Sequence, residues 1–372
     1  MRIYSVAALG ALFCVGCGTK TQTADPACAP SDAIVVASDY VSSRVGGVSL
    51  DGTVNLAWAG VDLGGDPILA VSRGRAFFVA RDKDLIFELD PSCGEPRSKI
   101  DVHDPKRQGT TNPQDVAIAP DGTWWVPRFN EPSIAVFEAH GSLAKTIDLS
   151  AYDPDGNPNA SAIEILDVGG ATKAFVALER LDDHDRLKSK LPSWMLRIDL
   201  ASGATDHLEL LGRDPFGTMD VADGFFYLAM PGNFDVADEA NAGVERFDPA
   251  SFTSKLLASE RDLGGSVTQV AMSKKCGAAI VADPTPNVNR TSVVVFDAVS
   301  GQVLAKNVFG PTDGFDLSSL AWRGNLLLVG DRRRAPGGFP IHVFEATDAC
   351  ALTLRPDTIF VSQKPVAVRV TR

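Results

Sequence analysis

Short stretches of alternating apolar and polar residues, separated by turn residues, recur along most of this chain. One stretch is a strand that ends on an acidic residue and is followed by a turn. Its seven copies are centred on Asp51, Asp90, Glu138, Asp199, Asp248, Asp297 and Glu345. Alternation with a period of two predicts half-buried strands, and the interval of roughly 40 to 60 residues is typical of β-propeller blades.

Each repeat also contains the other strands of a blade. The third repeat, for example, reads NPQDVAIAPDG, TWWVPRFN, SIAVFEA and LAKTIDL in order. The first repeat lacks an opening strand, and the last residues of the chain, KPVAVRV, supply a matching one. The sequence therefore predicts an all-β, seven-bladed β-propeller of four-stranded antiparallel blades over residues 32–372, with the C-terminal strand closing the first blade.

Composition and charge narrow the classes of function. A single closed ring accommodates all 372 residues, and 45% hydrophobic against 22% charged residues is typical of a globular protein with a large core. The formal net charge is −12, and the only dense cationic run is Arg332 to Arg334. Nucleic acid is therefore excluded as a partner, because no basic face would neutralise its phosphates.

The N-terminus reads as an export signal: Arg2, an apolar run that is too short to span a membrane, and Gly16 before Cys17. It resembles the signal of bacterial lipoproteins, with Cys14 at the first position of the cleavage box. The resemblance implies a signal peptide over 1–16, lipidation of Cys17, a flexible tether over 17–31, and membrane attachment through the lipid anchor only. A glycine after Cys17 favours the outer membrane. An ordinary cleaved secretory peptide is the alternative.

Four cysteines remain in the exported part, an even number in an oxidising compartment. Cys28 and Cys276 both precede a second strand, whereas Cys93 and Cys350 both lie in turns between third and fourth strands. We predict the disulfides Cys28–Cys93 and Cys276–Cys350, because both then join neighbouring blades in the same way. Free or otherwise paired thiols remain the alternative.

The openings PQDVAIAPDG and FFVARD and the strands VFEA and VFDAVSG resemble the YVTN and NHL class of bacterial β-propellers. These motifs encode the blade rather than a ligand, and the resemblance implies a family of binding modules, scaffolds and a minority of enzymes. Long insertions are expected on one face of the ring, where the connections between blades meet. They are residues 181–194, 231–242, 284–291 and 332–340.

Two sets of polar residues are candidates for chemistry. In the segment DPDGNPNASAIE, Asp153, Asp155 and Asn157 alternate and Glu164 follows, which are oxygen ligands of the kind Ca²⁺ takes. A turn without metal has the same composition. Alignment of the opening strands places Asp115, Glu164, Gln269 and Ser319 at the channel mouth. Polar channel residues that only contact water are the alternative there, and Trp194, at the end of the longest insertion, is a further candidate for ligand binding.

These observations predict a non-catalytic binding or scaffold module, anchored in the cell envelope, whose loop-rich face binds an envelope protein or an extracellular ligand. The alternative is a lactonase-like hydrolase in which Ca²⁺ at the channel mouth activates water. Structural display without a discrete ligand is a third possibility. No catalytic residue is singled out, because the chain lacks a nucleophile elbow, a P-loop and histidines at metal-binding spacing.

Overall fold

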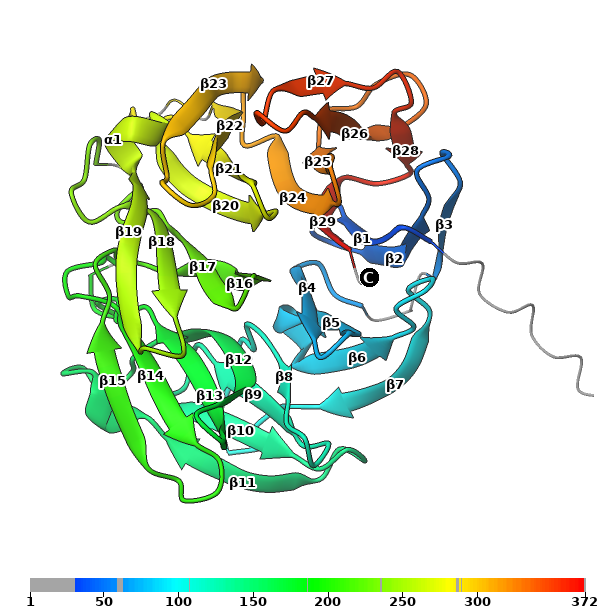
Figure 1. Cartoon of the computed structure of the whole chain (residues 1–372). Helices are drawn as coiled ribbons and strands as arrows, with labels where there is room; N and C mark the ends of the chain where they lie inside the picture. The colour runs from blue at the N-terminus through cyan, green and yellow to red at the C-terminus, as the bar shows by residue number, and fades with distance from the viewer. Residues whose placement is uncertain are drawn as a thin grey trace, which may run out of the picture.

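A computed structural model describes residues 31–58, 63–106, 108–185, 187–234, 236–285, 288 and 290–370. Seven antiparallel sheets stand around a central channel, with the chain running from blade to blade around the ring (Figure 1). The predicted seven-bladed propeller of four-stranded blades is confirmed. The predicted signal peptide and nearly all of the tether, with Cys14, Cys17 and Cys28, lie outside the described residues.

The strands of each blade follow one another from the channel outwards. Blade one contains β29 (Pro365–Arg369), β1 (Ala33–Ser38), β2 (Ser43–Val48) and β3 (Val54–Trp58). Blade two contains β4 (Pro67–Ser72), β5 (Arg75–Ala80), β6 (Leu85–Leu89) and β7 (Pro96–Asp101). Blade three contains β8 (Ala117–Ile118), β9 (Trp124–Arg128), β10 (Ser133–Phe137) and β11 (Leu143–Asp148). Blade four contains β12 (Ala160–Val168), β13 (Ala171–Leu178), β14 (Trp194–Asp199) and β15 (Thr205–Glu209).

Blade five contains β16 (Phe216–Ala222), β17 (Phe225–Met230), β18 (Gly243–Asp248) and β19 (Thr253–Ser259). Blade six contains β20 (Ser266–Met272), β21 (Cys276–Ala282), β22 (Thr291–Asp297) and β23 (Val303–Phe309). Blade seven contains β24 (Leu317–Arg323), β25 (Leu326–Asp331), β26 (Phe339–Ala346) and β27 (Leu352–Leu354), and β28 (Ile359–Val361) also pairs with β26. The described helices are short: η1 (Arg81–Lys83), η2 (Ser150–Tyr152) and α1 (Glu260–Leu263).

The last strand of the chain closes the ring. β29 pairs antiparallel with β1, placing Arg369 opposite Ile34 and Ala367 opposite Val36 (Figure 1). β1 is buried along its whole length. The predicted closure of blade one is therefore confirmed, and it covers an apolar edge that would otherwise be free to pair with another chain.

Apolar side chains fill the spaces between neighbouring blades. Phe77 of blade two meets Trp124 of blade three edge to face, with ring centroids 5.1 Å apart. Phe175 of blade four meets Phe226 of blade five in the same way, at 5.4 Å. Each blade therefore completes the core of the next, which explains why the second strands are the most apolar segments of the repeats.

A disulfide joins Cys276, at the start of β21, to Cys350, in the turn between β26 and β27. This confirms the predicted bond between blades six and seven. Cys93 is buried in the turn between β6 and β7, and its predicted partner Cys28 is outside the described residues. Within the described part of the chain, no helix is long and apolar enough to cross a membrane.

Candidate functional site

The connections between blades and those from second to third strands emerge on one side of the ring, which we call the loop face. Five large apolar side chains are exposed there on blades four and five, and we call them the apolar cluster. They are Leu187, Leu211, Phe216, Phe234 and Val236, each between 39% and 49% exposed. The rings of Phe216 and Phe234 meet edge to face at 5.8 Å. Exposed apolar rings that contact each other, as Phe216 and Phe234 do, are candidates for an interaction site.

Hydrogen bonds hold the loops that carry the apolar cluster. The backbone N–H of Ser189 donates to Asn233 Oδ1 at 3.0 Å, and Asn233 Nδ2 donates to the carbonyl oxygen of Ser189 at 3.2 Å. Glu245 is fully buried and accepts hydrogen bonds from the N–H groups of Leu211 (2.9 Å) and Gly212 (2.6 Å). The exposed side chains are therefore presented by fixed loops.

Two buried carboxyl groups lie at the base of these loops. Glu179 directly follows β13 and Asp214 precedes β16, and both contact Ser193, whose Oγ donates to the Glu179 carbonyl oxygen and accepts from the Asp214 N–H, each at 2.9 Å. Burial raises the pKa of Asp214 to about 7. Burial, and then the negative charge of Asp214, raises the pKa of Glu179 well above its usual value. The two carboxyls therefore hold a proton near neutral pH. The sequence analysis missed this pair, since it spans two blades.

Aspartates of the channel bond neighbouring blades to each other. Asp115 Oδ2 accepts the N–H of Ile163 in blade four at 3.0 Å, and its Oδ1 accepts the N–H of Val116 at 2.8 Å. In blade five, Asp220 Oδ2 accepts the N–H of Met272 in blade six at 2.6 Å. Both oxygens of Asp115 are thus already used within the protein, which gives this predicted site residue a structural role.

Glu164 lies in the same channel on β12. Burial, followed by the negative charges of Asp115 and Asp220, raises its pKa well above the usual value. Burial also raises the pKa of Asp115 to about 7, against the opposing charge of Arg369. Arg369 comes from the closing strand β29, and its guanidinium donates to Thr218 Oγ1 at 2.7 Å. Arg369 therefore acts on Asp115 and Asp220, and Arg73 acts on Glu164, in a centre where burial raises the pKa of each of the three carboxyl groups.

Gln269 and Ser319, the remaining predicted channel residues, do not lie at the same level of the channel as Glu164. Gln269 is paired with Ile280 and Ser319 with Gly330, each as the first pair after a bulge. In β12 the first pair after the corresponding bulge is Ala162 with Ala177, and Glu164 lies two residues beyond Ala162. Gln269 and Ser319 are therefore equivalent to each other, and Glu164 lies further along the channel than the alignment indicated.

The structure separates Glu164 from the segment that the sequence offered as a Ca²⁺ loop. Asp153 Oδ2 faces Arg180 Nε at 3.3 Å, and Asn157 Nδ2 donates to Asp183 Oδ2 at 2.9 Å. Asp155 instead lies near Asp182 and His184, with one ligand atom of each within 4.8 Å of the others. The three predicted loop ligands thus take protein partners from the 179–193 connection, while Glu164 lies in the channel.

Trp194, the remaining candidate, begins β14 and packs within blade four. Its ring stacks on His207 with centroids 3.9 Å apart, and the Arg180 guanidinium lies 3.7 Å from the ring centre. These two contacts occupy the ring, so an incoming ligand would have to displace a protein side chain in order to stack on it.

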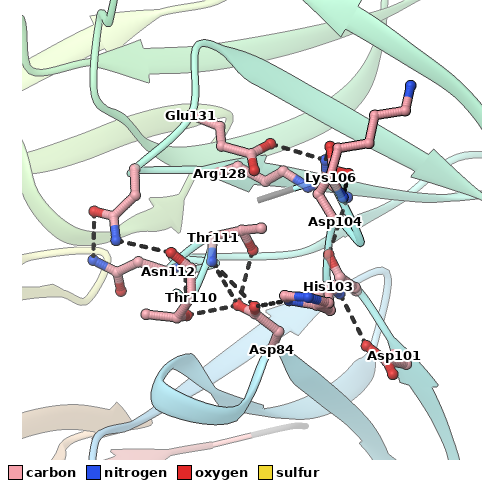
Figure 2. A network of polar contacts seen from close by, with 12 residues as sticks. Asp84, Asp101, His103, Asp104, Lys106, Thr110, Thr111, Asn112, Arg128 and Glu131 are labelled. Carbon is pink, nitrogen blue, oxygen red and sulfur yellow. Dashed lines mark hydrogen bonds and ion pairs between the residues drawn. The ribbon is translucent and has the colours of Figure 1, made fainter. Parts of the chain in front are cut away.

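A polar network fills another part of the loop face, between blades two and three (Figure 2). Asp84 is 3% exposed and accepts hydrogen bonds from Thr110 Oγ1 (2.7 Å), Thr111 Oγ1 (2.9 Å) and His103 Nδ1 (3.0 Å). Burial alone would raise the pKa of Asp84, but these hydrogen bonds outweigh it and hold the pKa below its usual value. The same bond raises the pKa of His103.

Arg128 extends the network. It is 2% exposed, lies 3.1 Å from Glu131 and 3.7 Å from Asp104, and donates to the carbonyl oxygen of Val102 at 3.0 Å (Figure 2). These contacts fix the long connection from β7 to β8. The sequence analysis did not anticipate this structured connection.

Comparison with known proteins identifies the fold. No protein-family model and no curated protein matches the chain. The periplasmic gluconolactonase PpgL of Pseudomonas aeruginosa is 14% identical, with a TM-score of 0.53 over 91% of this chain and 98% of that chain. A streptogramin B lyase is 11% identical (TM-score 0.52; 82% and 86%), and the dihydro-heme d1 dehydrogenase NirN is 13% identical (TM-score 0.52; 92% and 76%). Similarity at this level of identity shows a shared propeller fold.

Proposed function

We propose that this protein is a non-catalytic binding module that docks an envelope or extracellular protein on the apolar cluster of its loop face. The observation that carries the proposal is the group of five large apolar side chains exposed on hydrogen-bonded loops. Aromatic residues are enriched in the cores of protein interfaces, and the rings of Phe216 and Phe234 contact each other while remaining exposed. Loops that are already fixed bind with a smaller entropy cost.

The arrangement of the channel supports a binding module over the lactonase-like alternative. A catalytic Ca²⁺ would need carboxylate oxygens directed at one point. Both oxygens of Asp115 accept backbone N–H groups, and Arg369 neutralises part of the charge around it. The residues nominated for the metal are divided between the channel and the 153–159 segment.

Site-specific photocrosslinking in intact cells tests the proposed docking site. A photoreactive residue in place of Phe234 is expected to capture a discrete companion, and Phe216→Ser is expected to abolish that capture. Val299, which is 69% exposed in a turn of blade six, gives the matched control position. Capture of the same companions from both positions, or of none from position 234, would contradict the proposal.

We further propose that the propeller is exported and held at the outer membrane through a lipid on Cys17. The sequence pattern around Cys17 and the disulfide between Cys276 and Cys350, a bond typical of oxidising compartments, support this. Cys17→Ser is expected to move the protein from the membrane fraction into the soluble periplasmic fraction. Unchanged fractionation, or no incorporation of labelled fatty acid into the native protein, would argue for the ordinary secretory signal.

A further inference from the structure

A cavity of about 480 Å³ opens on the side of the ring opposite the loop face. Its walls come from the turns between first and second strands of blades five, six and seven, together with the turn between β26 and β27. The apolar part of the lining is Ala222, Met272, Trp322 and Ala346. Small-molecule sites are mostly apolar and measure about 300 to 1,000 Å³, so both the volume and the lining fit a small ligand.

The aromatic wall of this cavity is held in place on two sides. Trp322 Nε1 donates to the carbonyl oxygen of Ala271 in blade six at 3.1 Å. The ring also packs against the Cys276–Cys350 disulfide. Trp322 remains only half-buried, and it lines the cavity. A fixed indole ring beside a methionine offers a planar, polarisable surface suited to another ring.

The residues that line the cavity carry no net formal charge. Lys274 and Lys275 are balanced by Asp223 and Asp348, and Lys275 Nζ forms an ion pair with Asp348 at 2.7 Å. A ligand with a net charge of either sign would gain no overall attraction from this lining. Ser273, Thr347 and Asn325 also line the cavity, and their side chains already form hydrogen bonds with Cys276, Ala351 and Glu345 respectively, so the polar part of the lining is held in place.

We propose that this cavity is a binding site for a neutral, planar aromatic small molecule that packs against Trp322. The site is independent of the docking surface on the loop face, because the two lie on opposite sides of the ring. A ligand here would contact blades five, six and seven together and would stabilise the side of the ring already joined by the disulfide.

Fluorine NMR with 5-fluoroindole as the probe tests the proposal on the intact protein, since the protein itself contains no fluorine and only the probe gives a signal. The probe line is expected to broaden with the native protein. Thr347→Trp should fill the mouth and weaken binding at least about tenfold. Ala201→Phe, at an exposed turn of blade four on the same side of the ring, is the matched control and should bind normally.

Three results would overturn the proposal. The first is no broadening with the native protein at millimolar probe. The second is equal binding to the native protein and to Thr347→Trp, with Asn325→Trp as a second blocking variant should the first fail to fold. The third is tighter binding of 5-fluoroindole-3-acetate or 5-fluorotryptamine than of 5-fluoroindole, because the balanced charges of the lining predict the opposite order.

Discussion

Two regions of the loop face are built from the same kinds of connection but differ in what their side chains contact. Between blades two and three, the polar side chains around Asp84 and Arg128 are directed at one another (Figure 2). On blades four and five, the side chains of Asn233 and Glu245 bond to the backbone of the loops, whereas Phe216 and Phe234 remain 45% and 39% exposed. The first region uses its side chains for stability, whereas the second leaves apolar side chains exposed, where we propose that a partner docks.

We expect the largest effect from deletion of the strand that closes the ring, because both regions depend on the closed ring. Deletion of residues 365–372 takes away β29, exposes the edge of β1 and removes Arg369 from the channel carboxyls. We expect the thermal midpoint to fall by about 10 °C or more, because every blade depends on its neighbours for its core. Thermal melting followed by circular dichroism measures this. An unchanged midpoint would show that ring closure contributes little.

Asp84→Ala tests whether the polar network stabilises the fold. It leaves two threonine hydroxyls and His103 without their buried acceptor, and we expect the free energy of unfolding to fall by about 3 kcal/mol. Asp84→Asn is the matched control, because asparagine tolerates the left-handed backbone at this position (φ 52°) and keeps one acceptor oxygen. Its loss should be smaller. Equal losses in the two variants would assign the effect to the charge of the carboxylate alone.

Phe216→Ser combined with Phe234→Ser tests the opposite expectation for the apolar cluster. The two side chains are 45% and 39% exposed, so the free energy of unfolding should fall by no more than about 1 kcal/mol for each, less than for a fully buried ring. Affinity for the captured companion should fall by about 2 kcal/mol, or about thirtyfold. Denaturant unfolding and a binding titration measure the two quantities. A large loss of stability would place these rings in the core instead.

The smallest expected effect is a dependence of stability on pH that involves both regions. Asp115 and Asp214 have folded pKa values of about 7 against 3.8 in the unfolded chain. The folded state therefore holds more protons between about pH 4 and 7, and stability present at low pH is lost as the pH rises through 7. The raised pKa of His103 acts in the same direction.

Below about pH 4, the dependence of stability on pH has the opposite sign. Burial would raise the pKa of Asp331, but hydrogen bonds from His342 and Arg333 outweigh it and lower the pKa to about 2. Its contribution is lost as the pH falls from about 4 towards 2. We therefore expect the highest melting temperature near pH 4 to 5, and a lower one by a few degrees at pH 8. Asp214→Asn should flatten the decline between pH 5 and 8. A melting temperature that rises over that range would contradict the assignment.

The sequence predicted the parts of the molecule that repeat. The seven acidic-ended strands, the strand that closes blade one and the Cys276–Cys350 bond all follow from comparing one repeat with another. Features that join different repeats were missed. The connection around His103 and Thr110 and the pair formed by Glu179 and Asp214 depend on contacts between blades, which no local pattern records.

Alignment of the inner strands caused a different kind of error. β12 and β20 each carry a bulge at the corresponding place, but Gln269 directly follows its bulge, whereas Ala162 has that position in β12 and Glu164 lies two residues further on. The sequence alignment was therefore offset by two residues. The partner of Trp194 was likewise not predictable, because His207 approaches it from the next strand of the blade only after folding.

The closing strand also has a consequence for the order in which the protein can be made. Blade one is assembled from the first strand of the described chain and the last, so an emerging chain keeps an apolar strand edge at Ala33–Ser38 unpaired until Pro365–Arg369 has followed it. Any interruption of synthesis or export before that point leaves an open ring with a free edge. Pairing of β29 with β1 thus removes this free edge, and with it one route to aggregation.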